Sequence, residues 1–292
     1  MRHTHNKAKI IIKNATYLFF GRMATGLMSL LLMAVIARKL GVDKFGAYTL
    51  ALTIAGFFGV ASDFGSSYLT IREVARDKSK TGEYLLNGTI VKILLNVLFF
   101  FIFFVFVQYF YSSNFRIAIY LACIASIFGI FAQFYISFFN AYEKMHFTAI
   151  LSSLQSISVS VVCLIILLMG VNRIDCLFYG HMVVNFFMVL FSIVLLLKII
   201  SPQISKFDPG FSWQFFKKSI PFGLFFMGGV IYFQTDTIML SVMKDQTAVG
   251  LYQAAMQLVI AVEIIPSLLT TALYPTICRT YVHSREEAGR MM

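Results

Sequence analysis

The hydrophobic positions of this chain fall into long runs that short polar segments separate. Eight such runs can be recognised, at about 15–37, 45–71, 88–111, 115–140, 147–170, 176–200, 220–243 and 249–275. Each is longer than the roughly 20 residues that an α-helix needs to cross the hydrocarbon core of a bilayer. The pattern predicts an all-α polytopic membrane protein with about eight transmembrane helices.

The composition excludes a soluble protein. Hydrophobic residues make up 59% of the 292 residues, charged residues make up 13%, and the mean hydropathy is +0.81. Soluble domains carry about 25% charged residues. The net charge of +11 would suggest a nucleic-acid ligand in a soluble chain, but in a membrane protein basic loops explain it better. We therefore expect no nucleic-acid partner.

The basic residues are distributed unevenly between alternate loops. Of the 24 lysines and arginines, 16 lie in the N-terminal tail, residues 72–80, Lys144, residues 198–218 and the C-terminal tail. Six lie in the other loops, and Arg22 and Lys92 lie within spans. The positive-inside rule then predicts that both termini, and the loops near residues 76, 144 and 208, are cytosolic.

Cysteine and histidine show no spacing that indicates a metal site. The four cysteines and five histidines are scattered along the chain, without a CxxC pair. We interpret the cysteines as small apolar packing residues. We expect no metal ion and no cofactor.

The first two spans each carry a charge inside the predicted bilayer. Arg22 lies eight residues after Asn14, and Asp63 lies eight residues before Ile71. In an up-down hairpin both side chains would lie at the same depth, roughly 12 Å from one face. A lone ion there costs several kcal/mol, so we expect the two to pair or to share a water-filled cavity. A purely structural Arg22–Asp63 pair, with no transport role, is the alternative.

Two short segments share a frame of Gly, Tyr and Ala at an offset of 204 residues. One begins at Gly46 and the other at Gly250, and each starts the second helix of a predicted hairpin. This match indicates a parallel repeat, with chance similarity as the alternative. We expect a six-helix first bundle over 1–200, a cytosolic linker over 201–219, and the first two helices of a second bundle over 220–292. If the repeat is real, the sequence is expected to be a truncated or shortened two-bundle protein.

The polar connections are expected to be simple. Residues 72–80 are interpreted as a solvated loop, and residues 201–219 as a linker, with an interfacial stretch around 211–216 as one option. Pro221 is placed in the first turn of the seventh span, where proline is tolerated.

Several segments together resemble a known family. These are residues 13–16, 33–48, 63–65 with 72–73, 236–240, 249–255, 265–266 and 274–275. They are similar to the polysaccharide-export flippases, the O-antigen and exopolysaccharide repeat-unit transporters of the multidrug/oligosaccharidyl-lipid/polysaccharide exporter superfamily. The resemblance implies a transporter, not an enzyme, in the bacterial inner membrane. It would move undecaprenyl-diphosphate-linked oligosaccharides from the cytosolic to the periplasmic leaflet, among membrane lipid and other polysaccharide-assembly proteins.

With this resemblance, the polar residues inside spans become candidates for the transport path. Cations suit a diphosphate, amides suit sugar hydroxyls, and carboxylates suit a coupling ion. The substrate-path candidates are Arg22, Asp63, Lys92, Asn96, Gln133, Gln155 and Gln234, and the ion-coupling candidates are Asp236 and Glu263. For Lys92, snorkelling to the headgroups is an equal alternative. For the serines of the fifth span, close helix packing is slightly favoured.

Three other functions stay open. A multidrug or small-cation antiporter of the same superfamily should have a mainly acidic cavity, whereas this chain offers Arg22 and Lys92. A membrane glycosyltransferase or polymerase would need an acidic metal motif or a large loop. The third is a truncated, non-transporting membrane subunit.

Overall fold

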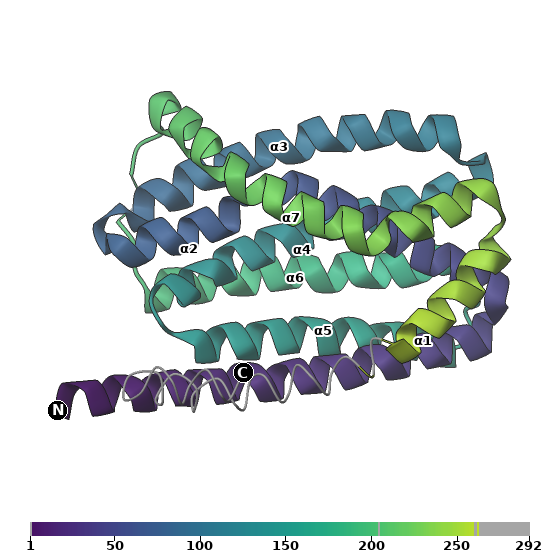
Figure 1. Cartoon of the computed structure of the whole chain (residues 1–292), viewed down its shortest axis with the longest axis horizontal. Coiled ribbons are helices and arrows are strands. Elements are labelled where there is room, and N and C mark those ends of the chain that lie inside the picture. The colour runs from purple at the N-terminus through teal and green to yellow at the C-terminus, as the bar shows by residue number, and fades with distance from the viewer. Residues whose placement is uncertain (1, 204, 260–261, 263–292) are drawn as a thin grey trace, which may run out of the picture.

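The computed structural model describes residues 2–203, 205–259 and 262, with the backbone alone for residues 2–20, 22 and 114. These residues form helices and no strand, which confirms the predicted all-α class. The helices are α1 (Arg2–Asp63), α2 (Ser66–Arg76), α3 (Thr81–Phe110), α4 (Ser113–Ala141), α5 (Met145–Leu168), α6 (Ile174–Ile199) and α7 (Pro209–Met243), with a 3-10 turn η1 (Lys78–Lys80) and a further helical stretch at 246–259 (Figure 1).

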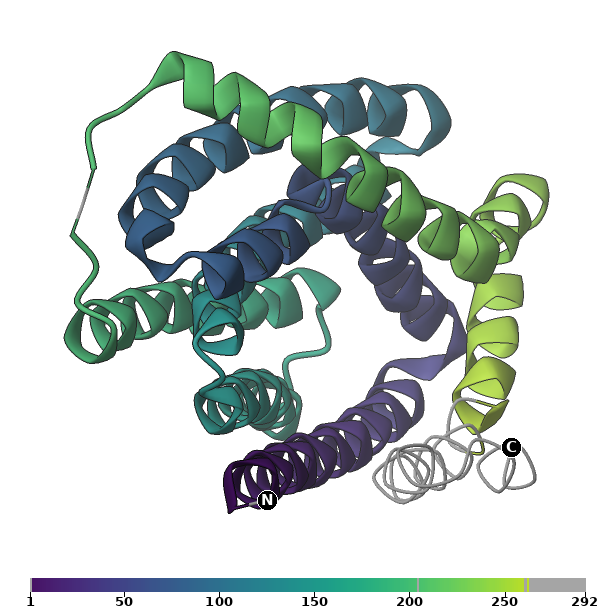
Figure 2. The ribbon, with the colours of Figure 1, turned by 60° about the vertical axis from the view of Figure 1, so that its left-hand side comes forward.

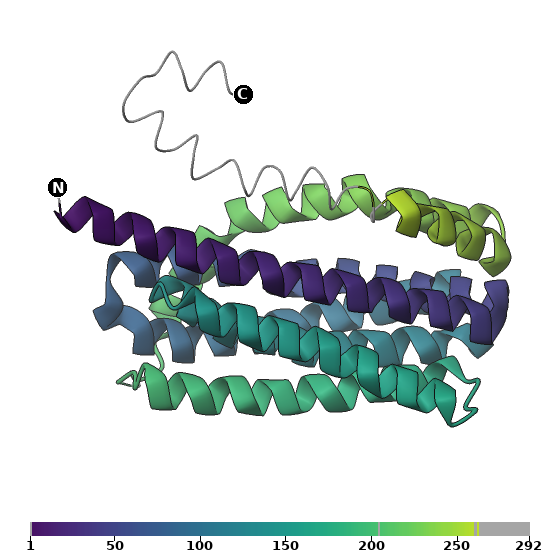
Figure 3. The same cartoon turned by 90° about the horizontal axis from the view of Figure 1, so that it is seen from below.

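Helix α1 contains the first two predicted spans, because it folds back on itself. Gly41 interrupts it with φ 80° and ψ 169°, a backbone conformation that glycine adopts without steric cost. The first limb, residues 2–40, and the second limb, residues 42–63, meet at Gly41 and diverge from it as an open, V-shaped hairpin, with α5 beside the first limb (Figures 1, 2 and 3). Six helical stretches of the described part are long and apolar enough to cross a membrane, the first of them covering most of this hairpin.

The helices from α3 to α7 correspond to the third to seventh predicted spans. They run between two ends of one bundle. The N-terminal end carries residue 2, η1, the turn at 142–144 and the segment at 200–208, and the opposite end carries Gly41 and the turns at 111–112, 169–173 and 244–245 (Figure 1). The eighth span begins at 246–259, and most of its remainder lies outside the described residues.

The expectation of a solvated loop over 72–80 is wrong for its first half. The second limb of α1 ends at Asp63, Phe64 and Gly65 turn with φ of 42° and 74°, and residues 66–76 form the amphipathic helix α2. Leu69 and Val74 are buried on one of its faces. Beyond α2, Asp77 accepts hydrogen bonds from the Ser79 hydroxyl (2.6 Å) and amide (3.0 Å), and these bonds lower the pKa of Asp77.

Helix α7 begins eleven residues earlier than the sequence indicated. Asp208 caps it by accepting a hydrogen bond from the Gly210 amide (2.8 Å), and Pro209 occupies the first turn. Pro221 therefore lies inside the helix, so its predicted place in the first turn is wrong. Phe215 is buried, which shows that residues 211–216 pack on the bundle as part of a helix. The proposed division into domains stays a prediction.

The centre of the bundle is formed by α4, which packs along α6 and is bordered by α1, α2, α3 and α5 (Figures 1 and 2). Large aromatic side chains fill this centre, among them Phe58, Phe134 and Phe138, each with no exposed surface. The second half of α3 instead exposes Phe101 and Val105. Exposed apolar side chains are the expected surface of a helix in lipid.

Two glycines make the closest approach between the α1 hairpin and the helix at 246–259. A Cβ built on Gly46 would lie 1.9 Å from the Gln246 carbonyl oxygen, and one on Gly250 would lie 2.2 Å from that of Val42. Gly46 and Gly250 are the equivalent positions of the predicted repeat. The two backbones can touch here only because both residues lack a side chain.

We predict that Gly46→Ala destabilises the protein, because the added methyl overlaps a helix backbone that cannot move locally. The expected cost is about 1–3 kcal/mol, the usual range for overpacking. Thermal unfolding of the purified protein in detergent, followed by circular dichroism, measures it. Gly59→Ala is the matched control, since its Cβ would meet nothing closer than 3.7 Å. Equal melting temperatures for both variants would contradict the close contact.

Candidate functional site

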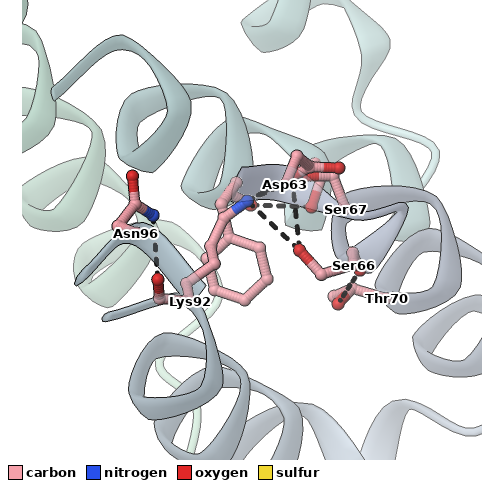
Figure 4. A network of polar contacts seen from close by, with 8 residues as sticks. Asp63, Ser66, Ser67, Thr70, Lys92 and Asn96 are labelled. Carbon is pink, nitrogen blue, oxygen red and sulfur yellow. Dashed lines mark hydrogen bonds and ion pairs between the residues drawn. The ribbon is translucent and has the colours of Figure 1, made fainter. Parts of the chain in front are cut away.

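A buried ion pair joins the α1 hairpin to α3. The ammonium of Lys92 forms a salt bridge with the Asp63 carboxylate, and the Lys92 side chain has no exposed surface (Figure 4). Lys92 also donates to the hydroxyls of Ser66 (3.2 Å) and Ser67 (3.4 Å), and it lies 4.9 Å from the ring centroid of Phe134. Snorkelling, the alternative interpretation of Lys92, is therefore wrong.

The turn between α1 and α2 places the carboxylate in this site. Asp63 is the last residue of α1, and the positive φ values of Phe64 and Gly65 fold α2 back beside it. Ser66 and Ser67 then donate to Asp63 at 3.2 and 2.6 Å. The start of α2 also presents its positive dipole end to this carboxylate. Local chain geometry thus supplies the donors that a buried carboxylate needs.

The structure gives Asp63 a different partner from the predicted Arg22. The carboxylate already has a cation, Lys92, from a third helix that the depth argument had not considered. The side chain of Arg22 is not among those described, so a role for Arg22 stays a prediction.

Two cavities open inside the bundle. The first, of about 450 Å³, is bordered by α1, α2, α4, α5 and α6. Its polar lining consists of Asp63, Ser67, Tyr68, Ser126, Gln133, Ser137, Asn140, Gln155 and Asn185. The second, of about 520 Å³, reaches along the two limbs of α1, and its polar lining consists of Thr25, Ser29, Tyr48, Gln133, Gln155, Ser156, Ser160, His181 and Asn185.

Three amide side chains border both cavities and are connected to one another. Gln133 of α4 donates to Gln155 of α5 (3.1 Å), and Gln155 donates to Asn185 of α6 (2.9 Å). Asn185 completes the series by donating to the carbonyl of Ala125 (3.0 Å). We call Gln133, Gln155 and Asn185 the amide chain. It brings together two predicted site residues, and Asn185 is one that the sequence analysis missed.

Three further predicted residues, Asn96, Gln234 and Asp236, line neither of these cavities. Asn96 donates to the Lys92 carbonyl (2.8 Å), and its own side-chain oxygen is buried without a partner. Gln234 has a buried, unpaired oxygen beside Gly56 and borders neither cavity. Asp236 is exposed, accepts from the Thr237 amide (2.7 Å) and is contacted by the Tyr252 hydroxyl. Glu263 lies outside the described residues.

Tyr48 and His181 are the other residues that sequence reasoning missed. Tyr48 is fully buried, and its hydroxyl lies 3.0 Å from the His181 ring nitrogen Nε2. Asn185 and His181 could have been identified from the sequence, since both are polar residues inside the apolar run of the sixth span. Within the described residues, no three histidine, cysteine or carboxylate side chains gather as a metal site would require.

These features define a multi-pass helical membrane protein with polar cavities in its interior. Residues 11–281 match the polysaccharide biosynthesis protein family, and the chain belongs to this family. This match confirms the resemblance found in the sequence.

The chain is also similar to individual proteins, one in sequence and one in structure. Over 65 residues the chain is 37% identical to a putative O-antigen transporter of Shigella flexneri, a stretch that is 22% of this chain and 15% of that protein. A solved structure called protein A superposes with a TM-score of 0.59 at 14% identity, which indicates a shared fold. That superposition covers 94% of this chain and 65% of the other, so the chain spans about two thirds of its length.

We predict that Lys92→Met costs up to about 3 kcal/mol of folding free energy, because it leaves the partly exposed Asp63 carboxylate inside the bundle without its cation. The double variant Lys92→Met with Asp63→Asn should regain most of this loss, since neither residue is then charged. Denaturant unfolding in detergent gives the comparison. Lys80→Met, which removes an exposed lysine in a 3.6 Å surface pair with Asp77, should change stability little. A double variant no more stable than Lys92→Met would contradict the pairing.

Proposed function

We propose that this protein is a flippase for lipid-linked oligosaccharides, acting in the synthesis of O-antigen or a related exopolysaccharide. Its substrate would be an undecaprenyl-diphosphate-linked repeat unit, moved from the cytosolic to the outer leaflet of the bacterial inner membrane. Membership of the polysaccharide biosynthesis family and the local likeness to a putative O-antigen transporter support this proposal. A transporter rather than an enzyme also fits the low polarity of the chain outside its cavities.

The observation that carries the proposal is the chemistry of the two cavity walls. Apart from Asp63, their described polar lining consists of amides, hydroxyls and one imidazole. Asp63 itself is neutralised by Lys92. Such walls offer many hydrogen-bond donors and acceptors with almost no net charge, which suits a polyhydroxylated sugar.

The same observation weighs against the antiporter alternative. A multidrug or small-cation antiporter needs an unpaired carboxylate to attract its ligand. The carboxylate that borders the first cavity is held by Lys92, Ser66 and Ser67 and is not free for a cation. We therefore place the oligosaccharide first and the cation second.

The diphosphate of the substrate would require cations near the cytosolic mouth. Ile71 of α2 borders the first cavity, and Arg72 follows it with its guanidinium 5.1 Å from the Phe222 ring centroid. Arg72 already pairs with the Glu73 carboxylate (2.8 Å), so Arg22 is the candidate for this contact, since guanidinium can hold a phosphate in two parallel hydrogen bonds. For the coupling ion, Asp236 and Glu263 remain proposals.

We predict that Gln155→Leu abolishes most of the surface polysaccharide that a full-length version of this protein restores in a bacterium lacking its own repeat-unit flippase. The leucine has a similar volume but removes the centre of the amide chain, so sugar hydroxyls lose their partners. Silver-stained polysaccharide gels measure the rescue, normalised to membrane protein level. Gln214→Leu is the control, because Gln214 is exposed on α7 and borders neither cavity. Normal polysaccharide in the Gln155→Leu strain would remove the amide chain from the substrate path.

We also predict that cysteines at Ser79 and Ser113 react with an impermeant thiol reagent from opposite sides of the membrane. Ser79 lies at the N-terminal end of the bundle and Ser113 at the opposite end, and both are exposed. The positive-inside rule places the Ser79 end in the cytosol. Cys123 and Cys163 are buried and should give little background, whereas the partly exposed Cys176 is replaced by serine in both variants. Labelling of both new cysteines from outside would contradict this orientation.

A further inference from the structure

The first half of α7 has an exposed face that borders neither cavity. Phe215 and Ser219 lie on the opposite, buried face, which packs on the bundle. We call the exposed face the outer face of α7, and its residues are Trp213, Gln214, Lys217, Lys218, Pro221, Leu224 and Phe225. These turns of α7 lie at the edge of the bundle (Figures 1 and 2). The outer face is thus open to whatever surrounds the protein.

Contacts with α3 fix the position of this part of α7. The Asn87 side-chain oxygen accepts hydrogen bonds from the Asp208 amide (3.0 Å) and from the Ser212 hydroxyl (3.1 Å). The Phe215 ring packs edge to face against Tyr84, with 5.7 Å between the ring centroids. The outer face therefore has a defined position relative to the rest of the bundle.

The outer face begins with aromatic and basic side chains. The Lys217 ammonium lies 5.1 Å from the ring centroid of Trp213, so the two side chains form one patch. Tryptophan is enriched where a bilayer meets water. In the part of the chain that the structure describes, neither Lys217 nor Lys218 has a carboxylate oxygen within 4 Å. Both ammonium groups are therefore available to an external anion.

Farther along α7 the outer face becomes apolar. Leu224 and Phe225 lie seven residues beyond the two lysines, roughly 10 Å along a helix that rises about 1.5 Å per residue. Both side chains are exposed. Gly228 and Gly229 follow, and a Cβ built on either would meet nothing within 4 Å. A phospholipid has the same order of groups, with its phosphate at one end and its acyl chains at the other.

We propose that the outer face of α7 binds an anionic phospholipid, with its phosphate at Lys217 and Lys218 and an acyl chain along Leu224 and Phe225. A lysine close to an anionic membrane surface strengthens association by about fivefold. Its ammonium carries three donors, which suits a single phosphate group. Pro221 lies between the two ends and cannot donate to the Lys217 carbonyl, so that oxygen can accept from a headgroup hydroxyl.

The phospholipid differs from the proposed transport substrate in where it binds. The polar groups suited to a sugar line the cavities, whereas the outer face is opposite the side of α7 that packs on the bundle. A sugar attached to a phosphate at Lys217 would therefore lie away from the cavity walls. A bound phospholipid would instead hold the start of α7 at a constant depth in the membrane interface. This proposal does not depend on the proposed function.

Trp213 makes the proposal testable, because it is the only tryptophan of the chain. The full chain is placed in phosphatidylcholine liposomes in which a fixed fraction of the lipid carries a nitroxide on its headgroup. The nitroxide quenches tryptophan fluorescence at close range. Phosphatidylglycerol then replaces unlabelled phosphatidylcholine. We expect the fluorescence of Trp213 to recover, with phosphatidylglycerol preferred over phosphatidylcholine by about fivefold.

Two double variants separate a defined site from a general attraction to basic residues. Lys217→Gln with Lys218→Gln should abolish the preference for phosphatidylglycerol. Lys78→Gln with Lys80→Gln is the matched control and should keep it, since it removes two exposed lysines from the same end of the bundle. Equal occupancy by both lipids in the wild-type protein, or loss of the preference in both double variants, would overturn the proposal.

The same measurement distinguishes a phospholipid from the lipid carrier of the proposed substrate. Undecaprenyl diphosphate is added to the liposomes in place of phosphatidylglycerol. We expect it to protect Trp213 only at a higher mole fraction than phosphatidylglycerol does. Protection at a lower mole fraction would overturn the phospholipid assignment and give the two lysines to the substrate. Absence of quenching by the nitroxide lipid would also overturn the proposal, because Trp213 would then lie outside the interface.

Discussion

A lysine ammonium without exposed surface persists inside a membrane protein only if other groups replace the water it has lost. Lys92 has this requirement, and Asp63, Ser66 and Ser67 satisfy it. The three partners come from the junction of α1 and α2, so the ion pair fixes the angle between these helices and attaches both to α3. The first cavity has Asp63 and Ser67 in its wall, so its shape depends on the same junction.

This arrangement explains how the interior can be polar and still carry almost no net charge. The charges of Asp63 and Lys92 cancel each other, and the members of the amide chain bond to one another and, through Asn185, to a backbone carbonyl. A wall of neutral, mutually bonded groups can exchange partners with a sugar hydroxyl at small net cost. An isolated charge in the same place would bind one ion strongly and release it slowly.

The sequence predicted the spans well because hydrophobicity alone decides which segments enter lipid. It failed at α2 and at the start of α7, where helices carry charges on one face and therefore resemble loops in a hydropathy profile. The partner of Asp63 was missed for a different reason. Counting residues along a helix gives the depth of a side chain in the bilayer. Arg22 and Lys92 both lie at about the depth of Asp63, and only the packing of the helices decides which of them faces the carboxylate. Gln133 and Gln155 were found because amides are conspicuous in apolar runs, whereas Tyr48 resembles any core aromatic until its hydroxyl is seen beside His181.

The contact between Gly46 and Gly250 has a consequence for how the two hairpins could separate. Backbones that touch through glycine share no side-chain hydrogen bond or ion pair at the point of closest approach. Parting the two surfaces at this point would therefore break no side-chain hydrogen bond or ion pair. Only dispersion attraction would be lost, and lipid or water would replace much of it. The α1 hairpin and the helix at 246–259 can therefore pack closely and still separate over a low energy barrier. A salt bridge in the same position would raise that barrier.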